Sequence, residues 1–207
     1  MVVTISREYG AGGIAVADGV AIALGYELFD DESLSRAVAA RLGTSPAAIS
    51  DRATKAPLGE RILEQLGTGM LDTPSPATPR LPGDFDEDVR REIERTIRDR
   101  AGAGRAVILG RNAGIVLGAQ PGVLRVFLIA ERGWRVERLS EYFGQSRERA
   151  LADLARVDGA RKKFAKDRYE LSWGDPHLYD LVLDVSRLGI SGAVALVVAA
   201  VRAWERS

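Results

Sequence analysis

Residues 2–24, "VVTISREYGAGGIAVADGVAIAL", pass from a short aliphatic segment through three glycines into an alanine-rich segment. This order predicts a buried strand at 2–5, a turn over 10–13 and a helix over 13–24. Glycines at such a turn let backbone N–H groups close around an anion, and the start of the helix adds partial positive charge. The stretch therefore indicates an α/β protein with a candidate phosphate site at its first crossover.

The turn lacks the lysine that phosphate loops usually carry. Against the pattern G-x-x-x-x-G-K-[ST] only Gly12 is in place, while Arg7, Gly13 and Ile14 stand where the first glycine, the lysine and the hydroxyl residue belong. A tight turn with no ligand explains the glycines equally well. The charges of Arg7 and Glu8 at the mouth of the strand favour a ligand. The spacing G-x-G-x-x-G is absent, which disfavours a dinucleotide site.

Four more aliphatic runs predict strands beyond the first, at 26–29, 106–109, 123–130 and 181–185. They are continuously apolar, as in strands that are buried on both faces of a parallel sheet. Helical patterns lie between or after them, at 32–42, 84–101, 132–142 and 189–204. We therefore predict a three-layer α/β/α fold with a five-stranded parallel sheet.

The 207 residues predict a single domain with two inserted parts. We assign the core to 1–42, 85–144 and 171–207. The proline-rich segment 43–84 is expected to cover the carboxyl ends of the strands, where open α/β sheets bind ligands. The segment 145–170 is expected to act as a lid.

The composition excludes several classes of function. There are 29 basic and 29 acidic residues, so no overall charge favours nucleic acid or an anionic membrane as a partner. Cysteine is absent, which excludes disulfides and thiolate metal sites and suits the cytoplasm. No signal segment opens the chain, and the longest apolar stretch, 193–201, is too short to span a bilayer. A small-molecule partner in the cytoplasm is expected, and a homodimer stays open.

Arginines elsewhere in the chain are candidates for the missing charge. Phosphoryl transfer needs positive charge around the phosphate oxygens, and a guanidinium is a planar fork suited to phosphate. Arg7 is closest to the loop, and Arg111 follows the third strand, beside the loop strand in the expected sheet. The segment 156–168 holds six basic residues against two acidic ones, with Arg156 and Arg161 as the leading candidates. The alternatives are a solvent-exposed Arg111 and a solvated charged face over 156–168.

A magnesium ion would need oxygen ligands. Asp30 and Asp31 end the second strand close to the loop, and Ser6 is a weaker candidate ligand. The two aspartates are also candidates for orienting a phosphate acceptor, and Asp31 alternatively caps the next helix. The single histidine, His177, is assigned a structural role.

Four stretches resemble one known family in the same order. They are "ISREYGAGG" (5–13), "LGYELFDDE" (24–32), "VILGRNAGIVL" (107–117) and "WGDPHLYDLVLDVSRLGI" (173–190). Together they look like the cytidylate kinase-like family, bacterial relatives of the nucleoside monophosphate kinases whose phosphate loop lacks the lysine. The resemblance implies phosphoryl transfer from ATP, with Mg²⁺, to a nucleoside monophosphate, with CMP or dCMP as first guess.

The resemblance also implies roles for residues. The ATP phosphates would lie on the loop residues Gly10, Ala11, Gly12, Gly13 and Ile14. The acceptor would be held by Asp30, Arg36, Arg111, Asn112 and Asp158. Arg156 and Arg161 match lid positions, and with Arg7 and Arg111 they form the predicted catalytic set. Asn112 replaces an aspartate of the family pattern, and Ile14 stands where the family often has a charged residue. The second hypothesis is therefore a non-catalytic nucleotide or phospho-ligand binding protein with a degenerate phosphate loop.

Overall fold

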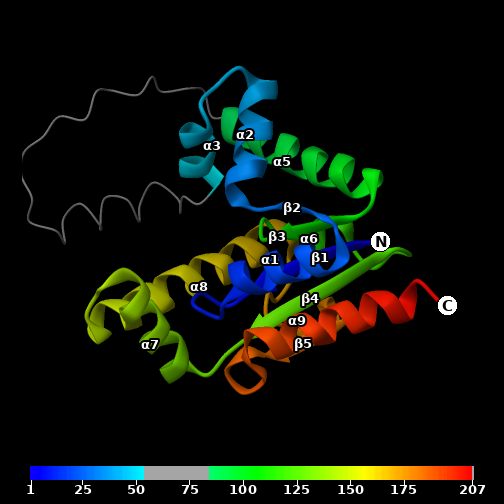
Figure 1. The fold of residues 1–207 in the computed structure, drawn as a ribbon. Helices are drawn as coiled ribbons and strands as arrows, with labels where there is room; N and C mark the ends of the chain where they lie inside the picture. The colour runs from blue at the N-terminus through cyan, green and yellow to red at the C-terminus, as the bar shows by residue number, and fades with distance from the viewer. Residues whose placement is uncertain (54–83, 207) are drawn as a thin grey trace, which may run out of the picture.

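A computed structural model describes residues 1–53 and 84–206, which form a central sheet with helices on both faces (Figure 1). The five strands pair in the order β2-β3-β1-β4-β5, and every pairing is parallel. Their bounds are β1 Val2–Arg7, β2 Glu27–Phe29, β3 Ala106–Leu109, β4 Val123–Ile129 and β5 Leu181–Asp184. The predicted fold class is confirmed.

The central strands are apolar along their length because both of their faces are covered. Successive side chains of a strand point to opposite faces. Val3 and Ile5 of β1 therefore pack in one core cluster with Val107 of β3, while Val2 and Ile108 belong to the cluster on the other face. The register Val3↔Val107 fixes this division.

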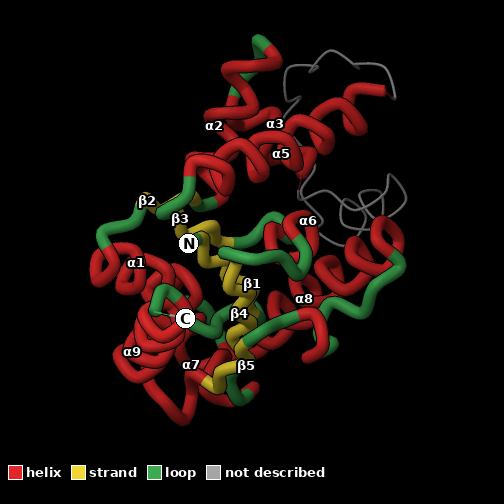
Figure 2. Tube along the Cα trace, turned by 90° about the vertical axis from the view of Figure 1, so that its right-hand side faces the viewer, coloured by secondary structure: helices red, strands yellow, loops and turns green. Residues whose placement is uncertain are grey.

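Helices pack on both faces of the sheet (Figure 2). On the first face lie α1 (Gly13–Leu24) and α9 (Val185–Trp204). On the second lie α2 (Asp31–Leu42), α3 (Pro46–Ala53) and α5 (Asp84–Ala103), with the short α6 (Ala113–Leu117). The i, i+4 spacing of Val89, Ile93 and Ile97 places all three on the buried face of α5.

At the end of the sheet opposite the two chain termini lies α7 (Arg132–Phe143), and α8 (Arg147–Tyr169) runs from there back along the sheet, where Ala165 packs in one buried cluster with Phe127 of β4 (Figure 1). The predicted lid segment 145–170 is the single continuous helix α8, which begins at Ser146, whose hydroxyl accepts the N–H of Arg149. Its far end is tied to α5, since Tyr169 donates to Glu94 at 3.2 Å and Arg168 pairs with Glu87. A short 3₁₀ turn, η1 (Pro176–Leu178), precedes β5.

Of the predicted insertion 43–84, the structure describes 43–53 and the first residue of α5. This part contains α3, which packs between α2 and α5, with Ile49 fully buried. Residues 54–83 lie outside the described part, so the acceptor-side role of the segment and the lid role of α8 remain predictions.

Among the described residues, α9 is long and apolar enough to cross a membrane, with a mean hydropathy of 1.6. Gly189, with φ +69°, forms a kink within α9, so the helix predicted at 189–204 is the longer segment after the kink, and a short segment from Val185 precedes it. Ala193, Val197 and Val201 are fully buried in the core cluster shared with α1 and the sheet. On its inner face α9 is therefore a core helix.

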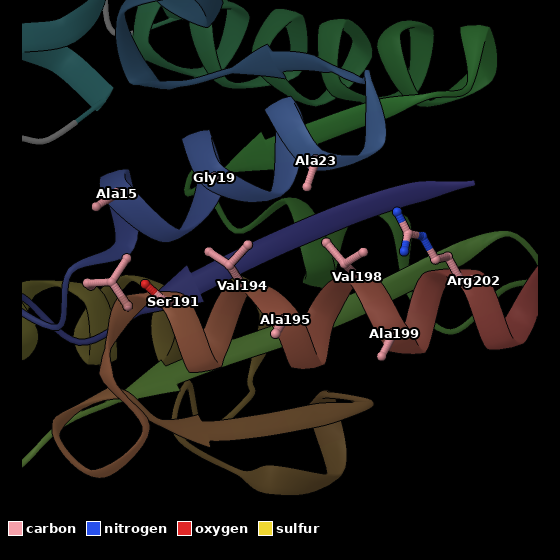
Figure 3. A pocket seen from close by; sticks show the side chains of 10 residues that line it. Ala15, Gly19, Ala23, Ser191, Val194, Ala195, Val198, Ala199 and Arg202 are labelled. Atoms are coloured by element: carbon pink, nitrogen blue, oxygen red, sulfur yellow. The ribbon is translucent and has the colours of Figure 1, made fainter.

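A groove of about 570 Å³ runs between α1 and α9, lined mainly by small residues (Figure 3). Its walls approach closely because Gly19 has no side chain: a Cβ there would lie 2.8 Å from Val194. None of the predicted site residues lines this groove. One end of the groove is formed by Ala15 and Ile190, and Ile190 packs against Gly12 of the glycine loop.

Candidate functional site

The glycine loop connects β1 to α1, beside the point where the connections after β1 and β4 lead toward opposite edges of the sheet. The connection after β1 leads toward β2 and the one after β4 toward β5, and open α/β sheets bind ligands where connections part in this way. Gly12, with φ +76°, is the N-cap of α1 and supplies no side-chain cap. The first amides of a helix have no acceptor within it, so the start of α1 is suited to an anion.

Packing also requires the glycines of this loop. A Cβ at Gly12 would lie 2.5 Å from Cδ1 of Ile190 in α9, and one at Gly13 would lie 2.7 Å from Cγ of Arg7. The aliphatic stem of Arg7 thus lies across Gly13. The ligand-free explanation of the glycines and the phosphate-loop explanation are both compatible with the geometry.

Arg7 and Arg111 meet on either side of one carboxylate. Arg7 donates from Nη2 to Oδ2 of Asp31 at 3.3 Å, and Nε of Arg111 lies 2.8 Å from Oδ1 of the same residue. The angle at that Nε is not that of a hydrogen bond, so it is a buried donor without an acceptor among the described residues. The guanidinium of Arg7 passes over Gly110, where any Cβ would collide with it.

Arg111 is buried, which excludes the solvent-exposed alternative. Its side chain is 7% exposed and donates to the hydroxyl of Ser35 at 3.2 Å. It follows β3, which pairs with β1, as the sequence predicts. Arg111 and Asn112 both have positive φ, of 50° and 53°, a conformation that costs energy in non-glycine residues and gathers at ligand sites. Asn112 is the N-cap of α6 without a side-chain cap bond.

Helix α8 brings a third guanidinium to the loop. Arg161 donates from Nη1 to the main-chain oxygen of Arg7 at 2.8 Å, and its guanidinium lies 6.0 Å from the ring centre of Tyr9. Burial, together with the nearby charge of Arg7, lowers the pKa of Arg161 to about 10. A bound anion would relieve this concentration of positive charge.

Asp158, one helical turn before Arg161, lies against the loop backbone. It accepts the N–H of Tyr9 at 2.8 Å and a hydrogen bond from Nη1 of Arg135 at 2.6 Å. Sequence reasoning missed Arg135 in α7. The available signal is that a charged residue stands in the buried stripe of the helix beside Val136 and Leu139.

Two predicted arginines point elsewhere. Arg156 is 59% exposed and pairs with Asp153 of its own helix at 3.3 Å. Arg36 is 62% exposed and pairs with Glu32 at 3.1 Å. The other basic residues of 156–168 are exposed, so for them the solvated-face alternative describes the structure. Those residues are Lys162, Lys163, Lys166 and Arg168.

The predicted magnesium ligands have other partners. Asp30, not Asp31, caps α2: its Oδ1 accepts the N–H of Ser33 at 2.8 Å. Partial burial raises the pKa of Asp30, but the hydrogen bonds from Ser33 outweigh it and the pKa lies below its usual value. Asp31 faces the two arginines, and Ser6 is buried on β1. Within 1–53 and 84–206, no three acidic or histidine side chains gather as metal ligands.

Two buried aromatic residues precede β5, and one of them lies beside Arg161. Trp173 and Tyr179 are buried and pack on Phe127 of β4, with ring centres 5.0 Å and 4.7 Å from it. The guanidinium of Arg161 lies 5.8 Å from the Trp173 ring centre. As expected, these rings pack the turn, and His177 is exposed in η1.

A known protein family matches the sequence across most of the chain. The model of the cytidylate kinase-like family matches residues 2–187. The chain belongs to this family. A cytidylate kinase of Natronomonas pharaonis is 26% identical over 205 residues, covering 99% of this chain and 91% of its own. One of Methanothrix thermoacetophila is 26% identical, with 99% and 100% covered.

Solved structures share the fold of this family member. An uncharacterized protein of Eubacterium ventriosum superposes with a TM-score of 0.69 at 20% identity, covering 98% of both chains. A gluconokinase of Sinorhizobium meliloti gives a TM-score of 0.53 at 17% identity, covering 99% of this chain and 94% of its own. These neighbours show the fold, and membership of the cytidylate kinase-like family supports a phosphotransferase-like enzyme.

Proposed function

We propose that this cytidylate kinase-like protein transfers the γ-phosphoryl group of ATP to a nucleoside monophosphate, with CMP or dCMP as the first candidates. The observation that carries the proposal is the convergence of Arg7, Arg111 and Arg161 beside the glycine loop. These residues come from three separate parts of the chain. Their shared location is what transfer of a multiply charged group requires in the absence of a loop lysine.

Arg7 is the proposed substitute for the lysine. Its stem crosses Gly13 and its guanidinium passes over Gly110, so it lies between the loop and the end of β3. From there it is placed to contact a phosphate held by the first amides of α1. Arg161, on α8, supplies a second guanidinium, which is bonded to the backbone of Arg7.

The ATP side of the site fits a polyphosphate. The free amides at the start of α1 and the lowered pKa of Arg161 both favour a bound anion. On the acceptor side, Arg111 is held by Asp31 and Ser35, and its guanidinium is proposed to bind the acceptor's phosphate in place of Asp31. Asp30, Arg36 and Asn112 stay predicted acceptor contacts.

In the proposed reaction, an anionic oxygen of the acceptor phosphate attacks the γ-phosphorus of ATP. A new P–O bond forms to the acceptor, the bond between the γ-phosphorus and its bridging oxygen breaks, and ADP leaves with that electron pair. No side chain has to remove a proton, because the attacking oxygen already carries negative charge. The arginines stabilise the charge on the transferred group, and α8 excludes water.

A magnesium ion, when bound with ATP, would neutralise phosphate charge. The carboxylates proposed for it are engaged by Ser33 and by the two arginines, so the described residues do not form a ready metal site. Magnesium usually keeps several waters and takes its other ligands from phosphates. The mechanism above therefore rests on the arginines and the loop.

The neutral overall charge and the absence of cysteine support a cytoplasmic enzyme whose partner is a small nucleotide rather than nucleic acid or a membrane. A non-catalytic nucleotide-binding protein is the second candidate. It is favoured by the position of Asp31, which already pairs with both Arg7 and Arg111.

A coupled ADP-release assay with magnesium across CMP, dCMP, UMP, AMP and GMP tests the proposal. We expect ADP release that depends on one of these acceptors and falls at least about a hundredfold in Arg111→Met. A substitution of Gly12 is a poor control, because any side chain there collides with Ile190. If ATP raises the melting temperature but no acceptor stimulates ADP release, the binding-protein alternative holds.

A further inference from the structure

Asp158 of α8 contacts the backbone of the glycine loop. Its Oδ1 accepts the N–H of Tyr9 at 2.8 Å, across 149 positions of the sequence. The side chain is only 13% exposed. A buried carboxylate that accepts a main-chain N–H fixes the backbone to which it is bonded.

Two arginines hold this carboxylate in place. Arg135 of α7 donates to its Oδ2 at 2.6 Å and also to the main-chain oxygen of Tyr9 at 3.3 Å. Nη1 of Arg161 lies 3.6 Å from its Oδ1. Tyr9 is thus bonded through both its N–H and its C=O to one charged cluster, and a shift of α8 would move the loop.

The preceding residue, Glu8, is fixed by the end of β4. Glu8 accepts the N–H of Ala130, at the end of β4, through Oε2 at 3.1 Å. Its own N–H donates to the main-chain oxygen of Leu128 at 2.9 Å. The peptide joining Glu8 to Tyr9 is therefore anchored to β4 and to α8 directly before the glycines.

The hydrogen bonds and ion pairs of Asp158 are made with residues on the loop side of the site. Among the described residues they are with Tyr9, Arg135 and Arg161. The acceptor-side group is a separate one, in which Arg111 is held by Asp31 and Ser35. Arg161 is linked electrostatically to both groups, because the negative charges of Asp158 and Asp31 both raise its pKa against the larger lowering by burial and by Arg7.

We propose that Asp158 is a positioning residue for the ATP-binding loop and not a ligand of the acceptor. It holds the Glu8–Tyr9 peptide so that the amides at Gly12 and Gly13 face the phosphates, and it makes the docking of α8 depend on the loop's conformation. Because linkage is reciprocal, ATP bound at the loop stabilises the docked α8, and a docked α8 raises the affinity for ATP. The kinetic part of this inference rests on the proposed function.

The test compares Asp158→Ala and Asp158→Asn with wild type. Alanine removes both the acceptor for the N–H of Tyr9 and the negative charge that faces buried Arg135. Asparagine can still accept the N–H of Tyr9, but it has no negative charge to face Arg135. Asp167→Asn on the same helix is the matched control, because Asp167 is 58% exposed and pairs with Lys163 of its own helix. All variants are checked for a cooperative melting transition. If Asp158→Ala does not fold, the result for Asp158→Asn decides the test.

Two readouts are measured. Hydrogen exchange of the amides in 9–13 should be about tenfold faster in Asp158→Ala, less affected in Asp158→Asn, and unchanged in Asp167→Asn. The KM for ATP should rise about tenfold in Asp158→Ala and the KM for CMP less than twofold. Unchanged exchange in 9–13, or a rise in the KM for CMP alone, would overturn the inference. If wild type turns over no acceptor, the proposed function fails, and the exchange data alone decide the positioning role.

Discussion

Arg161 of α8 donates a hydrogen bond to the main-chain oxygen of Arg7 across 154 positions of the sequence, at 2.8 Å. The bond holds Arg161 against the backbone of Arg7 at the start of the crossover from β1 to α1, where the positive charge of Arg7 acts on Arg161. Like charges in a partly buried site repel, and the lowered pKa of Arg161 reflects both burial and this neighbour. Such a site is stabilised when an anion enters it, which is the physical basis of the account.

The first prediction concerns the stabilisation of the protein by ATP. A ligand at about a hundredfold excess over its Kd adds about 2.7 kcal/mol to the free energy of unfolding. For a protein of this size that is a rise in melting temperature of roughly 5–10 °C. We expect this rise in wild type and less than half of it in Arg161→Met, measured by thermal melting without magnesium. Arg95→Met, an exposed residue of α5, is the control, and an equal rise in all three proteins would count against the site.

A second prediction separates stability from activity at Gly13. Alanine there adds a Cβ 2.7 Å from Cγ of Arg7, so the arginine stem must move, and the preference for alanine inside helices does not offset this because Gly13 is the first residue of α1. We expect Gly13→Ala to stay folded, to melt no higher than wild type and to lose at least tenfold in kcat. Gly102→Ala in α5, where a Cβ meets nothing within 4 Å, should keep full activity. Full activity in Gly13→Ala would show that the position of Arg7 is irrelevant.

The third prediction is a pH dependence of the docking of α8. Burial raises the pKa of Tyr169 to about 12, and Glu94 beside it adds to the shift. The unfolded chain has a tyrosine pKa near 10, so the stabilisation from Tyr169 is complete below pH 10 and is lost as the pH rises from 10 to 12. The free energy of unfolding of wild type, measured with urea, should therefore fall more steeply over this pH window than that of Tyr169→Phe. If the free energies of unfolding of the two proteins fall in parallel, the raised pKa of Tyr169 is contradicted.

The sequence predicts the fold well because its signals are local. Continuous apolar runs identify the buried parallel strands, and the glycine turn identifies the first crossover. Parallel strands also end at one edge of a sheet, so the meeting of Arg7 and Arg111 follows once β1 and β3 are neighbours.

The direction of helical side chains decides which other predictions agree with the structure. Residues five apart on a helix, such as Arg156 and Arg161, point about 140° apart and cannot both face the loop, while Asp158 and Arg161 share a face. In α2 the same rule puts Ser35, four residues after Asp31, toward Arg111 and leaves Arg36 in solvent. The packing of α7 against α8 joins residues distant in sequence, so the role of Arg135 depends on a tertiary contact that no sequence period encodes.

The most direct test of the central claim is transfer of label from γ-³²P-ATP to CMP by wild type, Arg7→Met and Arg7→Lys, each confirmed as folded by its melting curve. The account predicts labelled CDP from wild type, a rate at least about a hundredfold lower for Arg7→Met, and an intermediate rate for Arg7→Lys, whose ammonium keeps the charge without the fork. Equal rates for wild type and Arg7→Met would contradict the claim that this guanidinium takes the place of the loop lysine.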